Sequence, residues 1–193
     1  MLFRSRPFFL EGSQIFNNYG RQGSNNFWGF NNSEPQIFYS RRIGRSPQVS
    51  ADGDHKDVPQ ATTILGAAKL TGKTASGWSL GFLEAVTSEE SARTATGLTR
   101  ARVTVEPLTN YSVVRVQRDI GARAGLGFLS TMVERRLDGS ALKDNLTGTA
   151  FVGGPDGYFF LDRKRDWVVT RNIAASRVAG TAKVIEKLQK RSE

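Results

Sequence analysis

The chain has 193 residues, with 27 lysines and arginines against 18 acidic residues, and no cysteine. The missing cysteine excludes disulfides, thiolate metal sites and cysteine nucleophiles. The single histidine, His55, lies in a polar run typical of a solvated loop, and one imidazole is a poor basis for a zinc site or a Ser-His-Asp triad. We therefore expect no metal and no cofactor.

The net charge of +9 raises the question of nucleic acid or an anionic membrane surface as a partner. The basic residues are spread along the chain, and no zinc-finger, helix-turn-helix or RNA-binding signature accompanies them. We expect no nucleic-acid partner.

Residues 1–60 predict an irregular segment. Asparagines and glycines alternate with aromatic residues over 16–32, and this density indicates turns whose aromatic side chains pack onto something larger. A short strand is predicted over 36–43 and a polar loop over 44–60. The segment also holds the densest basic stretch, which contains Arg41, Arg42 and Arg45.

Residues 61–180 predict antiparallel hairpins, because runs of about ten residues alternate apolar and polar side chains with a period of two. The predicted strands are 62–71, 78–87, 110–119, 126–135, 147–153, 158–163 and 167–174. Glycine-rich stretches between them predict turns at 72–77, at 121–125 and at the Gly-Gly-Pro-Asp-Gly run 153–157. A short basic helix over 181–191 is predicted within the final stretch, 181–193.

The alternation predicts one apolar face and one face with long polar side chains. The apolar face is expected to carry Ile64, Gly66, Ala68, Leu70, Val114 and Val116. The polar face is expected to carry Lys69, Arg115 and Gln117. Trp78 and Trp167 lie near strand starts, where the aromatic girdle of a membrane barrel would lie.

The expected fold is all-β: an antiparallel up-and-down meander forming an incomplete outer-membrane-type β-barrel, preceded by the irregular segment and followed by the short helix. A soluble β-sandwich produces a similar alternation, so the residues leave both interpretations open. Basic side chains in mid-strand suit a water-filled lumen, and tryptophans at strand starts suit a membrane interface. These two features favour the barrel.

No motif predicts a catalytic residue. Gly-Lys-Thr at 72–74 lacks the earlier glycine that a phosphate-binding loop needs, and it lies in a hairpin turn. Four acids can be nominated as the carboxylate pairs of a glycoside hydrolase, but nothing in their spacing selects them. They are Glu84, Glu106, Asp162 and Asp166. Glu89 and Glu90 are interpreted as solvated loop residues.

Seven segments, in one order along the chain, resemble a single family. They are RPFFLEG (6–12), IFYSRRIGR (37–45), ILGAAKLTGKT (64–74), GWSLGFLEAVTSEE (77–90), VEPLTNYSVVRVQRD (105–119), ERRLDG (134–139) and AFVGG (150–154). Together they resemble domain-of-unknown-function family 5916. The resemblance implies an exported bacterial protein with an N-terminal family 9-type carbohydrate-binding module and a large C-terminal β-barrel-like region. It implies localisation in the outer membrane, with the lipid bilayer as a partner and carbohydrate as a ligand of the N-terminal module.

The resemblance also implies that this chain is a truncated piece of the barrel-like part, with the signal peptide and the sugar-binding module outside it. The family has no established catalytic residues, and its hydrolase labels derive from the attached module. The expected function is that of an uncharacterised outer-membrane protein linked to carbohydrate binding or passage. No enzyme activity is assigned to these residues.

Five basic residues are predicted to line the lumen or to form salt bridges in it, and a basic lumen would select anionic or hydroxyl-rich solutes. They are Arg41, Arg42, Arg45, Lys69 and Arg115. The apolar run 6–12 is expected to turn into the lumen and pack there. Two alternatives remain open: a hydrolase with a carboxylate pair in a cleft, and a soluble β-sheet interaction module with an inward apolar core and a polar outside.

Overall fold

The computed structural model describes residues 7–20 and 36–190, and strands predominate in them. In chain order the elements are α1 (Pro7–Leu10), α2 (Gln14–Asn17), the 3-10 helix η1 (Ser40–Arg42), β1 (His55–Asp57), β2 (Ile64–Lys73), β3 (Trp78–Thr87), β4 (Glu90–Thr96), β5 (Thr99–Glu106), β6 (Thr109–Ile120), β7 (Ala124–Arg135), α3 (Ser140–Lys143), β8 (Thr149–Phe160), β9 (Val168–Asn172), β10 (Ala175–Ala179) and α4 (Ala182–Lys190). The all-β class and the short C-terminal helix are confirmed. The turns predicted over 21–32 lie outside the described residues.

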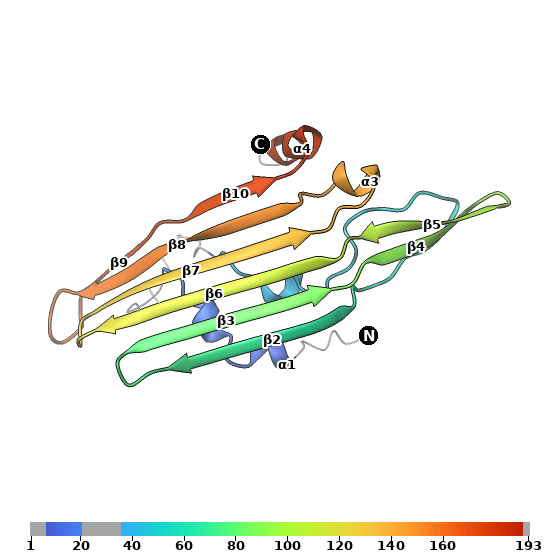
Figure 1. The fold of residues 1–193 in the computed structure, drawn as a ribbon. Coiled ribbons are helices and arrows are strands. Elements are labelled where there is room, and N and C mark those ends of the chain that lie inside the picture. Colours follow the sequence, from blue (N-terminus) through green and yellow to red (C-terminus); the bar gives the residue numbers. More distant parts are fainter. Residues whose placement is uncertain (1–6, 21–35, 191–193) are drawn as a thin grey trace.

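The largest sheet is an antiparallel meander with the strand order β10-β8-β7-β6-β3-β2, and β9 joins it beside β8. Strands that follow one another in the chain are neighbours in the sheet, except where β4 and β5 intervene between β3 and β6 and where β9 and β10 both pair with β8 (Figure 1). β9 and β10 lie one after the other along the same edge of β8. Across the described residues the sheet stays open and does not close into a barrel, with β2 at one edge and the β9–β10 run at the other.

The two ends of this sheet differ. At one end short turns join β2 to β3, β6 to β7 and β8 to β9. At the other end β3 continues into β4, β5 returns into β6, and the connection from β7 to β8 contains α3. Figure 1 shows the β4–β5 hairpin projecting beyond that end.

The β4–β5 hairpin pairs with β1 in a second, three-stranded sheet. Two interpretations of loops are wrong at this point. Glu90 begins β4, and its carboxylate accepts a hydrogen bond from the backbone of Thr63, whereas Glu89 is exposed between strands. His55 belongs to β1 and pairs with Ala95, so the predicted polar loop 44–60 contains a strand, although His55 is exposed as expected.

The prediction of a turn at 153–157 is also wrong, because β8 runs unbroken through these residues. The carbonyl of Pro155 accepts a hydrogen bond from Ile173, in the link where β9 ends and β10 begins. The side of the strand on which Pro155 has no N–H is therefore the side where strand pairing is interrupted. A Cβ on Gly154 would lie 1.8 Å from the carbonyl oxygen of Ile173. The glycine therefore serves close backbone approach in a strand and not chain reversal.

The short strand predicted over 36–43 is replaced by η1. The backbone N–H of Arg42 donates to Tyr39 and that of Ile43 to Ser40, at 3.1 Å each. Phe38 and Ile43 are buried against the sheet. This segment lies over a face of the sheet, and within the described residues it pairs with no strand. Burial of its apolar side chains therefore determines its conformation.

Residues 7–20 and 36–43 pack against one face of the large sheet, which we call the inner face; Figure 1 shows the N-terminal helices against it. The core between them contains Phe9, Phe16, Phe38, Ile43, Leu83, Tyr111, Val113 and Leu129. Each large side chain buried in this way contributes about 1.5–3 kcal/mol. Gly81 makes room for the Phe16 ring, which a Cβ there would approach to 2.8 Å.

One side chain changes face relative to the prediction. The register of β2 against β3 shifts between Ile64 and Gly66, so that Leu65 is an extra residue and Ile64 packs against the inner-face core. The remaining assignments for β2 hold, because Leu70 pairs with Phe82 on the exposed face and Lys69 pairs with Leu83 on the inner face. A bulge of this kind cannot be inferred from alternation alone.

Candidate functional site

A buried ion pair lies at the middle of the inner face. The guanidinium of Arg115 on β6 donates to both carboxylate oxygens of Asp156 on β8, at 2.5 and 2.9 Å, and both side chains are 0% exposed. Gly127 on the intervening strand makes this possible, because a Cβ there would lie 2.6 Å from Asp156 and 3.0 Å from Arg115. The fork-to-fork geometry is the strong form of an arginine–carboxylate contact.

The N-terminal segment is attached to the same place. The backbone N–H of Gly20 donates to Asp156 at 2.9 Å. The hydroxyl of Tyr19 donates to the carbonyls of Ile173 at 2.7 Å and Pro155 at 3.2 Å. Burial, followed by the charge of Asp156, raises the pKa of Tyr19. These polar contacts therefore hold the covering segment in addition to the apolar core.

Lys69 forms a second attachment point near the β2 edge. Its ammonium donates to the carbonyl oxygens of Phe8 and Glu11 and lies 5.0 Å from the centre of the Phe8 ring. Lys69 therefore satisfies one carbonyl oxygen of α1 and one of the residue that follows it. Phe9 belongs to the run 6–12, which was expected to turn into the lumen, and it is buried in the inner-face core.

A smaller network lies toward the short-turn end. Lys73 pairs with Asp119 at 2.8 Å, and Gln117 and Tyr158 donate to the same carboxylate at 3.2 and 3.4 Å. The hydrogen bond from Lys73 is the main reason that the pKa of Asp119 is lowered. Burial and the neighbouring Asp119 raise the pKa of Tyr158.

Toward the opposite end the inner face contains a cavity of about 910 Å³. Arg42 and Arg45 line it from the segment around η1, and Arg135 lines it from the end of β7. Arg135 donates to the carbonyl and hydroxyl oxygens of Thr147 at 3.1 and 3.2 Å. Burial lowers the pKa of Arg135, and the charges of Arg45 and Arg42 act in the same direction against those of Tyr111 and Glu106.

The five predicted basic residues therefore do not form one site. Arg42 and Arg45 share the cavity, Arg115 is in the buried ion pair, and Lys69 holds α1. Arg41 is exposed in η1. The sequence interpretation missed Asp156 because it lay in an expected turn.

It also missed Arg135, the third arginine of the cavity. Arg135 is on the inner face by parity with Leu129 and Val133. Because Leu129 and Val133 are apolar, the inner side of β7 has the pattern of a hydrophobic core, and this pattern does not single out Arg135.

Within the described residues, the outer face of the large sheet is largely apolar and exposed, apart from polar residues such as Glu84 and Glu134. Exposed side chains form a continuous surface over six strands, with exposed fractions from 38% to 71%. They include Leu70, Leu80, Phe82, Val114, Leu126, Phe128, Phe151, Phe159 and Val169. The register places Leu80, Val116 and Phe128 side by side across three strands. Contiguous exposed apolar surfaces are unusual on monomeric soluble proteins and are typical of interaction surfaces.

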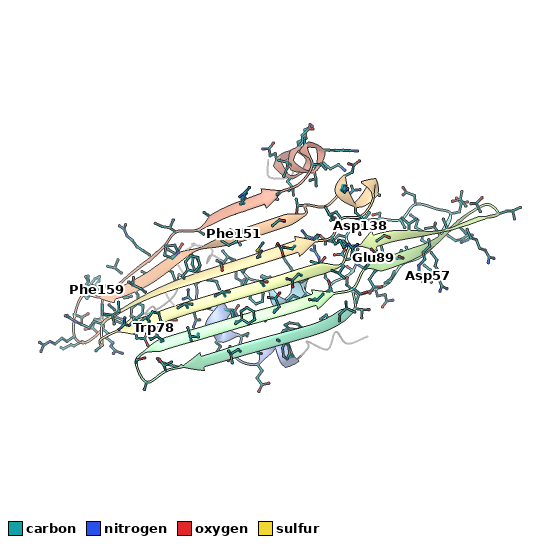
Figure 2. The ribbon with its side chains drawn as sticks, in the orientation of Figure 1. Asp57, Trp78, Glu89, Asp138, Phe151 and Phe159 are labelled. Carbon is teal, nitrogen blue, oxygen red and sulfur yellow. The ribbon has the colours of Figure 1, made fainter. Side chains whose placement is uncertain are left out.

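The borders of this surface are different in character. Trp78 lies on the outer face at the start of β3, with the Arg118 guanidinium 5.2 Å from its ring centre. Figure 2 shows Trp78 and Phe159 at the short-turn end and Glu89 and Asp138 at the opposite end. Aromatic side chains thus border one end and acids the other.

None of the nominated acids lines the inner-face cavity. Glu106 is buried and accepts two hydrogen bonds from Gln48, at 2.7 and 2.8 Å. Glu84 lies in β3 on the outer face, and Asp162 caps the turn before β9 through the backbone N–H groups of Asp166 and Trp167. Among residues 7–20 and 36–190, no group of three or more His, Cys, Asp and Glu side chains has metal-binding geometry. No helix in the described part of the chain is both long and apolar enough to cross a bilayer.

These features define a class: an open antiparallel β-meander whose covered inner face combines an apolar core with a buried ion pair, and whose outer face is largely apolar and exposed. The family is also established. The chain belongs to the family described as Domain of unknown function (DUF5916), whose model matches residues 3–178. No curated protein and no solved structure matches the chain significantly.

Proposed function

We propose that this chain forms part of the wall of an outer-membrane β-barrel in a bacterium, with its outer face against lipid. Its inner face and the segment that covers it would act in the binding or passage of anionic or hydroxyl-rich, carbohydrate-related solutes. The observation that carries the proposal is the exposed apolar surface over six strands, opposite an inner face with a fully buried ion pair. A soluble sheet of this design would leave that surface in water, at a large cost.

The dimensions support a lipid-facing wall. Strands β6, β7 and β8 have 12 residues each, and β2 and β3 have 10. On β7 the outward residues run from Ala124 to Met132 before Glu134 ends the apolar series. The eight residue steps from Ala124 to Met132 are about 27 Å along the strand at ~3.4 Å per residue, or about 21 Å across a bilayer at a tilt of ~40°. Transmembrane barrels have an apolar band about 25 Å tall.

The ends of the strands support the same arrangement. Bacterial outer-membrane barrels have short turns on one side and long excursions on the other. This sheet has both, and Trp78 lies at the short-turn end where an aromatic girdle belongs. In a membrane, the free backbone groups of β2 and of the β9–β10 edge would have to pair with further strands.

The experiment that tests this proposal locates the protein in its own cells. An antibody against the exposed β4–β5 hairpin would follow it through separation of inner and outer membranes, and its gel mobility would be compared in boiled and unboiled samples. Recovery in the outer membrane with a heat-dependent mobility shift supports the barrel wall. Recovery in the soluble fraction without a shift contradicts it and favours a soluble module whose apolar face is covered by another domain.

A further inference from the structure

The cavity lined by Arg42, Arg45 and Arg135 has features that a barrel wall does not require. Four parts of the fold enclose it: the inner face of the sheet, the segment after η1, the stretch that follows α3, and α4. Its volume, about 910 Å³, is within the range of sites for small organic ligands.

Two of the arginines that line this cavity have a hydrogen-bond donor without an acceptor. The Nε–H groups of Arg45 and Arg135 are buried, and no described atom accepts from them. Buried donors are normally paired, and an unpaired one is costly because its water has been removed without replacement. The backbone of Arg45 is itself fixed, since its carbonyl accepts from the N–H and the hydroxyl of Thr62 at 2.8 and 2.7 Å.

The positively charged residues that line the cavity outnumber the negatively charged ones. Asp52 is the acid in its lining, against three arginines. Glu106 is near enough to act on Arg135 electrostatically, but Gln48 already donates to both of its carboxylate oxygens. An oxyanion that accepts hydrogen bonds from both Arg45 and Arg135 would offset their mutual repulsion. It would also satisfy their unpaired Nε–H groups.

The lining also contains an apolar wall. Val133, Ala150 and Val178 line it from the sheet, and Val184 and Leu188 line it from α4. Val178 and Leu188 are each 42% exposed, which leaves them free to contact a ligand. A bare inorganic anion would use the arginines and leave this wall in contact with water.

We propose that this cavity binds a small organic oxyanion, a carboxylate or a phosphate attached to an apolar body. The oxyanion accepts from Arg45 and Arg135, and the apolar body lies against β10 and α4. The site depends on the inner face alone. It therefore stands or falls separately from the proposal that the outer face meets lipid.

The test uses the full chain, folded in detergent or lipid, and three probes with the same ring: 2-naphthoate, 2-naphthyl phosphate and the neutral 2-naphthalenemethanol. Binding is measured by calorimetry, with inorganic phosphate as a fourth ligand. We expect one or both organic anions to bind at a single saturable site, at least about tenfold more tightly than the alcohol and than inorganic phosphate. The stronger of the two anions identifies the oxyanion as carboxylate or phosphate.

Variants assign the binding to this cavity. Arg45→Gln keeps the backbone contacts with Thr62, and with Arg135→Gln it is expected to weaken binding at least about tenfold. Arg100→Gln makes the same charge change on the exposed β4–β5 hairpin and is expected to leave affinity within about twofold. If the double variant does not fold, Arg45→Gln alone decides. The proposal is overturned if neither anion saturates by about 1 mM, if the alcohol or inorganic phosphate binds as tightly as the organic anions, or if a folded arginine variant binds like the parent chain.

Discussion

Removing one partner of the Arg115–Asp156 pair should be among the most destabilising single changes in this chain. Arg115→Met preserves most of the side-chain volume and leaves a carboxylate with 0% exposure facing an uncharged neighbour. Gly20 still donates one hydrogen bond to it, which is far less than the two lost from the guanidinium. Breaking a buried pair in this way costs about 3–5 kcal/mol. For a chain of this length that is a fall of about 6–20 °C in the unfolding midpoint.

The assay is thermal or urea unfolding of the full chain, followed by tryptophan fluorescence. Arg136→Met is the matched control, because Arg136 pairs with Asp138 at 3.0 Å in the open, with side chains 75% and 64% exposed. Its expected cost is less than about 1 kcal/mol. The double variant Arg115→Met/Asp156→Leu should recover most of the loss, since it leaves no buried charge behind. Equal effects of Arg115→Met and Arg136→Met would refute this account of the inner face.

Two further predictions concern the backbone of β8 and the network at the short-turn end. Gly154→Ala should lower the unfolding midpoint strongly, because its Cβ would overlap the carbonyl of Ile173, whereas Gly66→Ala, with no atom within 4 Å, should change it little. Equal midpoints for the two variants would show that the link between β9 and β10 does not approach β8 as described. Asp119 has a lowered pKa because of Lys73, so its contribution to stability should be present above about pH 4 and lost as the pH falls through the folded-state pKa. Asp119→Asn should therefore destabilise the chain at neutral pH and converge with the parent chain in acid, and a difference independent of pH would contradict the assignment.

The hairpins could be predicted from the sequence because each strand of the large sheet has one face that must be buried and one that must not. Alternation around Phe82 and Val114 fixed both the strands and the face, and the register confirms it. The same reasoning located the helix at the C-terminal end of the described residues. These are local patterns with long, regular periods, which are the most reliable signals in a single sequence.

Two local signals were misleading because distant contacts override them. Glycines with a proline usually indicate a turn, but at 153–157 they permit the close approach of the backbone of Ile173 and Ala174 at the edge of β8. The run 36–43 has strand-forming residues, yet it packs across a sheet face and forms η1. The β4–β5 hairpin was missed because its strands are short and its side chains mostly polar.

The candidate site was predictable only in part. Arg42 and Arg45 stand out as a basic run, and they do line a cavity together. Their third partner, Arg135, comes from a strand 90 residues later, as the difference of their numbers (135 − 45) shows. Asp156, the partner of Arg115, could not be found without knowing that β6 and β8 lie two strands apart with a glycine between them.

The most direct test of the central claim is to ask which face of the sheet touches lipid. The chain has no cysteine, so single cysteines can be placed along β7 at positions 126 to 133 and carry spin labels in the membrane-inserted protein. We predict a period of two: labels at Leu126, Phe128 and Met132 should be accessible to oxygen dissolved in lipid, and labels at Leu129 and Val133 should not. Uniform accessibility to a water-soluble relaxation agent along the outward positions would contradict the account and place the apolar face against protein or water.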